Sequence, residues 1–348
     1  MLIVKSILSK VRGILLCVGL LAAPAHAQNY DLVLSHFFQA DSGFQEEMID
    51  PWVQQLHSRS GGRISVRVHG AETWLGNVAH QYDQVSSGLV DIAFGHTGIP
   101  RGQFTCTNIT DLPFLVDSGQ KGNVILHQLF PEFLQHEFRH VKMLALIAPE
   151  PGVLLTRDHP ISRPEELNGL KIGVPSPNIA RLFSDMGAET VTLAPIQVHE
   201  RFASGQIDGL LMPWWGVSAF KLDEVAQYVL EMDAYSVPAF MIMNKHTYET
   251  MPGDLQAVLD SLSSTSLYES TGGTWNVAMN RAQLTLQIDR MRNDFIARGG
   301  EVRQLKADLR QDWLAAADGT ITEIEAELSE ACGADLIARA RELSAAGD

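Results

Sequence analysis

The chain has 348 residues, 45% of them hydrophobic, and a formal net charge of −15 at pH 7. This length suits about two domains, and the apolar fraction is ordinary for a globular protein with a sizeable core. Such an acidic chain is a poor partner for nucleic acid or for anionic lipid head groups, so we expect no nucleic-acid binding.

Residues 1–27 have the pattern of a secretory signal peptide. Three basic residues flank a short apolar run, Ile14 to Ala23, on its N-terminal side, and a small-x-small cleavage site ends at Ala27. The alternative is an uncleaved membrane anchor, but a spanning helix needs ~20 apolar residues, which is far longer than this run. We therefore expect a mature protein that begins at Gln28 and lies in the periplasm.

The first part of the mature chain alternates strand and helix patterns. The expected strands are 31–34, 63–69, 90–94 and 142–147, and the expected helices are 43–60, 79–87 and 124–141. Gly61-Gly62 ends the first of these helices. Alternation of this kind predicts parallel strand pairing and a layered α/β architecture.

A second series of alternating elements follows. Its expected strands are 153–156, 171–174, 191–193 and 207–211, and its expected helices are 164–167, 178–186 and 198–204. An apolar segment at 240–244 suggests that the chain then returns to the first series. Residues 255–297 are expected to form a long helix with a break at Gly272-Gly273, and 307–346 two more helices around Gly319 and Gly333.

Two cysteines remain after removal of the signal peptide, Cys106 and Cys332. In an exported protein they can form one disulfide, and two separate buried thiols are the alternative. Two cysteines so far apart in sequence do not make a metal-binding motif.

Several short motifs occur in a fixed order along the chain. Residues 167–174 read Leu-Asn-Gly-Leu-Lys-Ile-Gly-Val, residues 186–188 Met-Gly-Ala, and residues 204–209 Ser-Gly-Gln-Ile-Asp-Gly. Earlier pieces are Gly-Gly-Arg-Ile at 61–64, Leu-Gly at 75–76, Gly-Leu-Val-Asp-Ile-Ala at 88–93 and Asp-Leu-Pro-Phe-Leu at 111–115. Together they resemble the DctP family, the solute-binding proteins of tripartite ATP-independent periplasmic (TRAP) transporters.

The resemblance implies a two-lobed periplasmic-binding-protein fold, in which each lobe is a mixed sheet flanked by helices. The implied division is lobe 1 at 28–148, lobe 2 at 149–237, and a return at 238–348. This last part holds a long bracing helix and C-terminal helices shared by both lobes. It further implies capture of a small organic solute by hinge closure and delivery to the membrane permease subunits of a TRAP transporter. No chemistry, cofactor or metal is implied.

The chain departs from the family pattern at the positions that usually hold a ligand carboxylate. The two arginines expected there are Gly152 and Gly173, an expected asparagine is Met212, and an expected glutamate is Gln197. Since a buried carboxylate without a partner is costly, an amine or a ring-bearing compound is favoured over a simple carboxylate. The alternative is a carboxylate held by His36, His96 and backbone amides.

In α/β sheets, ligands lie beyond the carboxyl ends of the strands. Applied to this chain, the rule predicts one site made of residues that follow the expected strands, where aromatic faces suit a flat ring or an ammonium group. With the two glycines above, the predicted ligand-binding residues are His36, Phe37, Trp74, Asn77, His96, Thr97, Gly152, Gly173, Ser176, Met212, Trp214 and Trp215. For each aromatic residue, packing in the core is the competing role.

Two other functions must be weighed. His136-Glu137-Phe138-Arg139-His140 matches the H-E-x-x-H pattern of zinc metallopeptidases, which needs both histidines on one helix face. Here the motif runs directly into the strand expected at 142–147, so we expect no zinc site. A solute sensor that serves a signalling partner instead of a permease would have the same sequence features.

Overall fold

The computed structural model describes residues 28–346 apart from 101, 194–196 and 264–280. The signal peptide predicted for 1–27 and the break predicted at Gly272-Gly273 therefore lie outside the described residues. Within them, no helix combines the length and the apolar character that crossing a membrane requires.

The first sheet has five strands in the order β2-β1-β3-β10-β4. Their bounds are β1 Tyr30–Ser35, β2 Ile64–His69, β3 Ile92–His96, β4 Val141–Ile147 and β10 Ala239–Asn244. β1 pairs in parallel with β2 and β3, whereas β10 pairs antiparallel with β3 and β4. The expected return of 240–244 to the first series is thus confirmed.

Helices cover both faces of this sheet because side chains of a strand point alternately to its two faces. On β10, Phe240 and Ile242 pack with α2 (Gln81–Ser86) and α3 (Gly119–Leu129). Met241 and Met243 point the other way, toward α1 (Asp50–Arg59) and α8 (Gly253–Ser261). We call this sheet and these helices, with the short α7 (Lys245–Glu249), the first lobe.

The second sheet has six strands in the order β11-β9-β5-β8-β6-β7. Their bounds are β5 Val153–Thr156, β6 Lys171–Val174, β7 Glu189–Thr192, β8 Gly209–Met212, β9 Tyr228–Glu231 and β11 Glu301–Gln304. β5 is antiparallel to both of its neighbours, β8 and β9. The helices around this sheet are α4 (Pro177–Asp185), α5 (Val198–Ala203), α6 (Trp214–Ala219) and α10 (Arg281–Ala297), and we call this part the second lobe.

The chain leaves the first sheet at Ile147 and enters the second at Val153; it leaves the second at Glu231 and returns at Ala239. The two connections, 148–152 and 232–238, are hydrogen-bonded to each other. Gly152 N donates to Tyr235 O (3.1 Å), and Ser236 Oγ donates to Pro149 O (2.7 Å). We refer to them as the crossing segments.

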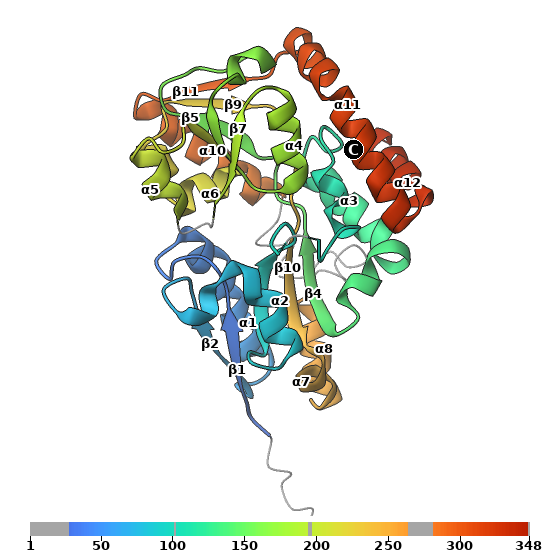
Figure 1. The fold of residues 1–348 in the computed structure, drawn as a ribbon. Coiled ribbons are helices and arrows are strands. Elements are labelled where there is room, and N and C mark those ends of the chain that lie inside the picture. Colours follow the sequence, from blue (N-terminus) through green and yellow to red (C-terminus); the bar gives the residue numbers. More distant parts are fainter. Residues whose placement is uncertain (1–27, 101, 194–196, 264–280, 347–348) are drawn as a thin grey trace, which may run out of the picture.

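A long C-terminal helix, α11 (Ala307–Cys332), lies along both lobes and is followed by α12 (Ala334–Ala345) (Figure 1). Trp313 of α11 is buried in the second lobe, whereas Ile324 and Leu328 are buried in the first. Cys332 at its end forms a disulfide with Cys106 of the first lobe. This pairing answers the question that the sequence left open, and it makes α11 a brace between the lobes.

Three local expectations need correction. The helix predicted at 124–141 is α3 followed by short π and 3₁₀ turns, which end before β4 begins at Val141. The strands β9 and β11 were not predicted; the four residues of β11, Glu-Val-Arg-Gln, carry little hydrophobic pattern. The single long helix expected at 255–297 is described only as α8 and α10, and the described helix that contacts both lobe cores is α11.

Candidate functional site: a cavity between the lobes

A cavity lies where the two lobes and the crossing segments meet. About 80 Å³ of it is open to the centre of a water-sized sphere. A single water needs only ~10–15 Å³ by this measure, so the space suits several waters or one small organic molecule. Its wall is formed by Phe37, Val78, His96, Ile99, Pro149, Glu150, Gly152, Gly173, Val174, Pro175, Leu193, Val198, Leu210, Leu211, Met212, Pro213, Trp215, Phe220, Tyr235, Ser236, Val237 and Ala239.

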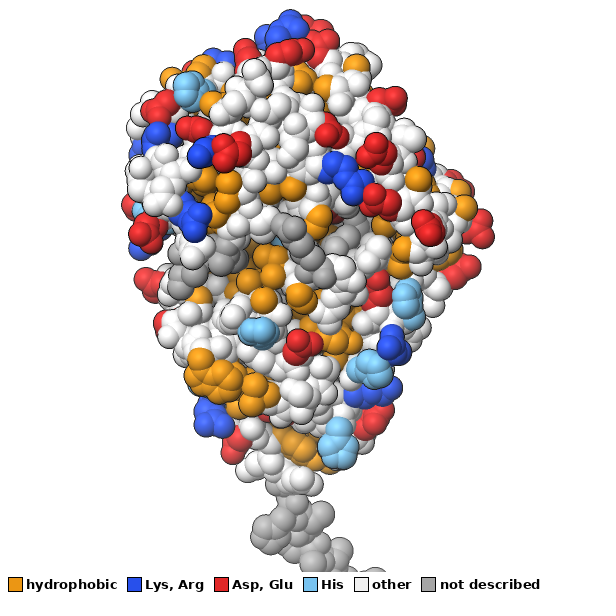
Figure 2. Space-filling model, viewed as in Figure 1, with side chains coloured by type: hydrophobic (Ala, Val, Ile, Leu, Met, Phe, Trp, Pro, Cys, Tyr) orange, Lys and Arg blue, Asp and Glu red, His pale blue; other side chains and the backbone are white. Residues whose placement is uncertain are grey.

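Most of this wall is apolar, with aromatic rings from both lobes. Phe37 follows β1 in the first lobe, whereas Trp215 and Phe220 come from α6 and its end in the second lobe. Hydrophobic side chains are also visible on the surface where the lobes meet (Figure 2). Flat aromatic faces in a mostly apolar space favour a ligand with a ring.

Tyr235 brings a polar group to the wall from the second crossing segment. A side chain at Gly152 would place its Cβ 2.0 Å from the Tyr235 hydroxyl, so only glycine leaves room for this ring. The Tyr235 residue is 2% exposed, and its hydroxyl has no hydrogen-bond partner among the described residues. Burial, assisted by the nearby Asp111, raises the pKa of Tyr235 well above its ordinary value. The hydroxyl therefore stays protonated at neutral pH, and its hydrogen-bonding capacity is unused among the described residues.

His96 supplies a second polar group. Burial lowers the pKa of its imidazole to about 4, so the ring is neutral at neutral pH. Its Nδ1 lies 3.2 Å from the backbone N–H of Gly98 and accepts that hydrogen bond. The hydrogen of the neutral ring then belongs on Nε2, which is available as a donor.

Glu150 is the one carboxylate among the described residues of the wall. Its Oε2 accepts a hydrogen bond from the backbone of Gly119 at the start of α3 (3.0 Å). No lysine or arginine appears among the described residues of the wall. The described part of the wall thus has a formal negative charge and contains no cationic side chain that could neutralise a bound carboxylate.

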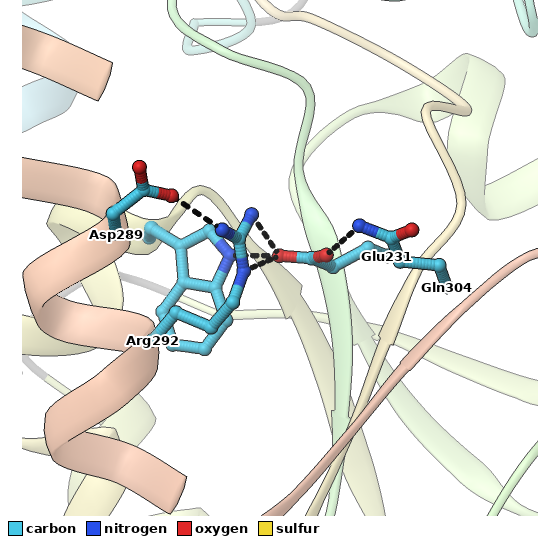
Figure 3. Close-up of polar contacts among 5 residues, drawn as sticks. Glu231, Asp289, Arg292 and Gln304 are labelled. Carbon is cyan, nitrogen blue, oxygen red and sulfur yellow. Dashed lines mark hydrogen bonds and ion pairs between the residues drawn. The ribbon is translucent and has the colours of Figure 1, made fainter. Parts of the chain in front are cut away.

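The adjacent residues Trp214 and Trp215 have different surroundings. Trp214 is 3% exposed and is packed in the core of the second lobe, where its Nε1 donates to Glu231 Oε1 (2.8 Å). Figure 3 shows how Glu231 also binds Arg292 and Gln304, while Asp289 holds Arg292 from the other side. This network fixes the Trp214 indole away from the cavity.

Six of the twelve predicted ligand-binding residues lie on the cavity wall: Phe37, His96, Gly152, Gly173, Met212 and Trp215. The other six do not. Besides Trp214, Ser176 and Asn77 use their side chains to accept from Ile179 N and Ala79 N at helix starts. His36 contacts Gln45 and Phe38, Thr97 binds Asn108 and Pro238, and Trp74 is 73% exposed on the surface.

Residues 136–140 do not have the helical geometry that the H-E-x-x-H pattern requires. His136 and Glu137 lie in a 3₁₀ turn (Gln135–Phe138) that ends before His140, so the two histidines do not share a helix face. Glu137 accepts from Cys106 N and Thr107 N (both 2.9 Å) and from the Thr107 hydroxyl. Cys106 also lies near His136 and Glu137, but its sulfur belongs to the disulfide.

Two lobes joined by crossing segments, with a cavity between them, define the class of bilobal solute-binding proteins. The model of the family "Bacterial extracellular solute-binding protein, family 7" (DctP) matches residues 34–327. The chain belongs to this family. It is a solute-binding protein, as the resemblance in the sequence implied.

Individual relatives agree with this assignment. A TRAP solute-binding protein from Rhodoferax ferrireducens T118, in complex with copurified benzoate, is 25% identical with a TM-score of 0.83, over 91% of this chain and 98% of that one. A TRAP periplasmic solute-binding protein from Bordetella bronchiseptica with bound (R)- and (S)-mandelate shares the fold at 23% identity and a TM-score of 0.77, over 90% and 98%.

Curated relatives are equally distant in sequence. A solute-binding protein of Roseobacter denitrificans is 25% identical over 275 residues, which are 75% of this chain and 82% of that protein. An uncharacterized protein, y4mM, of Sinorhizobium fredii is 26% identical over 60% of this chain, and the match spans only 39% of its length.

Proposed function

We propose that this protein is a periplasmic receptor that captures a small ring-bearing solute between its lobes and delivers it to the membrane permease of a TRAP transporter. The observation that carries the proposal is the apolar cavity between the lobes, with Phe37, Trp215 and Phe220 on its wall. The ring-bearing ligands of the Rhodoferax and Bordetella proteins, benzoate and mandelate, support the same ligand class.

In this proposal the first lobe is residues 28–148 and the second 149–237, and the remainder returns to the first lobe and braces both. The ligand contacts are the six predicted residues on the wall together with Tyr235. The protein acts by binding alone, without chemical change of the solute. The engagement of Glu137 in backbone hydrogen bonds supports this view, because it leaves no free general base in the 136–140 motif.

A thermal-shift screen of residues 28–348 against single-ring compounds tests the ligand class, with open-chain compounds of similar size as controls. A ligand present at about 100 times its dissociation constant adds ~2.7 kcal/mol of stability, which is readily detected. We expect shifts with ring compounds only. Shifts confined to open-chain solutes would contradict the proposal.

Export is tested separately. The full chain, expressed in a Gram-negative host, is expected in the periplasmic fraction with an N-terminus at Gln28 by intact-mass analysis. Retention in the cell membrane at full length would show that residues 1–27 act as an anchor instead.

A further inference from the structure

The chemistry of the cavity wall carries an inference about the group that the ring bears. We infer that the solute is a ring-bearing amine that is protonated at neutral pH, such as a ring with an aminomethyl group. Its ammonium group binds Glu150 and Tyr235. This inference rests on the proposed function, because it concerns the same cavity.

Charge is the first argument. Glu150 is the one formally charged side chain among the described residues of the wall, and Gly119 N occupies only its Oε2. A carboxylate ligand in the same small space would face Glu150 with no cation among the described wall residues to offset the repulsion, and like charges at close range in a low-dielectric site repel strongly. An ammonium group instead pairs with Glu150, which meets the requirement that a buried charge have a partner.

The surroundings of the crossing segments are acidic as well. Asp233, on the same crossing segment as Tyr235, has its pKa raised by burial, and Glu231, Asp117 and Glu150 raise it further. Arg310 lowers the pKa of Asp233, donates to Met232 O and lies over the ring of Phe114. Arg310 is therefore engaged outside the cavity and is not on its wall.

The second, independent argument is the hydroxyl of Tyr235. A buried hydroxyl without a partner costs roughly 1–3 kcal/mol, so its retention calls for a ligand atom that pairs with it. The oxygen of Tyr235 has lone pairs that accept from an ammonium N–H. Gly152 leaves room for this ring, since any larger residue would overlap the hydroxyl.

Aromatic faces complete the arrangement. Phe37, Trp215 and Phe220 border the cavity, and such faces attract both a ring and a cation. Neutral His96 offers an N–H donor at Nε2. An ammonium group has no acceptor for this donor, but a ring substituent such as a hydroxyl can accept from it. The wall therefore matches a ring with a cationic head better than a ring with an anionic one.

The test is isothermal titration calorimetry of residues 28–348 at pH 7.5 with four probes. Benzylamine has a ring and a cation, benzyl alcohol a ring without charge, benzoate a ring and an anion, and butylamine a cation without a ring. We expect benzylamine to bind most tightly, benzyl alcohol more weakly and benzoate least among the ring compounds.

Variants then assign the contacts. Glu150→Gln keeps an oxygen for Gly119 N and removes the charge, so benzylamine is expected to lose roughly 10- to 100-fold in affinity while benzyl alcohol changes little. Tyr235→Phe is expected to weaken both by about 2- to 10-fold. Glu132→Gln, an exposed glutamate far from the wall in sequence, is the matched control and should bind like the natural protein.

The outcomes separate the two proposals. Two results would overturn the inference of an amine ligand: tighter binding of benzoate than of benzylamine, or an unchanged benzylamine affinity in Glu150→Gln. Neither result would contradict the proposed receptor for a ring-bearing solute. If no ring compound binds, or if butylamine binds as well as benzylamine, the proposed function itself fails.

Discussion

Trp214 and Trp215 show how two neighbours of the same type take different roles. Trp214 is buried against Phe295 and donates to Glu231, whereas Trp215 is only half-buried and lies on the cavity wall. Consecutive residues of a helix point about 100° apart, so one of them faces the second-lobe core and the other the first lobe.

Substitution of each tryptophan by alanine is expected to separate stability from binding. Trp214→Ala should lower the free energy of unfolding by about 3–5 kcal/mol, because it opens a core cavity and leaves Glu231 without one donor. Trp215→Ala should weaken a ring-bearing ligand by about 0.5–1.5 kcal/mol beyond its lost contact area. Urea unfolding and calorimetric titration measure the two effects. Equal losses of stability in both variants would contradict this division.

Asp111 is a buried acid near Tyr235 of the second crossing segment. Its residue is 1% exposed, and Oδ1 has no partner among the described residues. Burial raises its pKa from 3.8 to about 7, against smaller opposing effects of hydrogen bonds from Ser176 and Asn178. Since these two residues belong to the start of α4, the acid lies between the lobes.

The raised pKa of Asp111 predicts a pH-dependent stability. Between pH 3.8 and about 7 the unfolded chain has lost this proton and the folded chain keeps it. The unfolded state then binds fewer protons, so this group lowers stability as pH rises through that window, by up to roughly 4 kcal/mol. Asp111→Asn removes the effect, and the variant should gain stability over the natural protein from pH 4 to pH 8.

Urea unfolding at pH 4, 6 and 8 measures this difference, in which the contributions of the other groups cancel. The exposed Asp41→Asn provides the control. A difference between Asp111→Asn and the natural protein that stays constant with pH would show that Asp111 ionises freely.

At the scale of elements, the brace α11 depends on its two ends. Trp313 packs with Phe183 of α4 in the second lobe, and the disulfide Cys106–Cys332 holds the other end to the first lobe. Cross-linking residues that are 226 apart in sequence restricts the unfolded chain strongly.

Loss of this disulfide is expected to cost about 2–5 kcal/mol in the free energy of unfolding. The Cys106→Ser/Cys332→Ser double variant and the reduced natural protein should unfold at the same lowered urea concentration. The double variant should also be insensitive to reductant. A natural protein whose unfolding is unchanged by reductant would contradict the predicted contribution.

Hydrophobic patterns predicted most strands of both sheets, since buried strands concentrate apolar residues. They missed β9 and the edge strand β11, which has one apolar residue, and they did not separate Gly319 from Gly333. Gly319 is helical with open space around it, while Gly333 has φ +91° and ends α11. The sequence around a glycine does not by itself reveal whether that glycine continues a helix or ends it.

The candidate site was only partly predictable for a related reason. The rule that ligands lie beyond strand ends selected Phe37, His96 and Met212, which do lie on the wall. It also selected residues such as Ser176 that cap a helix start. Tyr235 was missed because it lies on a crossing segment, 83 residues from the glycine that makes room for it. Only the fold brings such a pair together.

At the scale of the whole molecule, the two lobes are in contact, and aromatic rings pack against each other across the boundary between them. Trp215 of the second lobe contacts Phe38 edge-on (centroids 5.2 Å apart) and Phe44 (6.0 Å) of the first. Phe220 stacks on Phe38 at 5.8 Å. Pairs of this kind are each worth about 0.5–1.5 kcal/mol beyond area burial, so together they stabilise the contact between the lobes.

Phe44 allows this contribution to be tested without touching the cavity, because it is not on the wall. Phe44→Ala should open the unliganded protein, with a larger radius of gyration in small-angle X-ray scattering, while saturating ligand restores the dimensions of the natural protein. The apparent affinity should equal the affinity of the closed protein multiplied by the fraction of molecules that are closed without ligand, because binding must then restore closure. Phe130→Ala, a half-buried ring of the first lobe that packs against Phe138, is the control and should change neither quantity. Unchanged scattering in Phe44→Ala would mean that α11 and the crossing segments, and not the aromatic contacts, hold the lobes together.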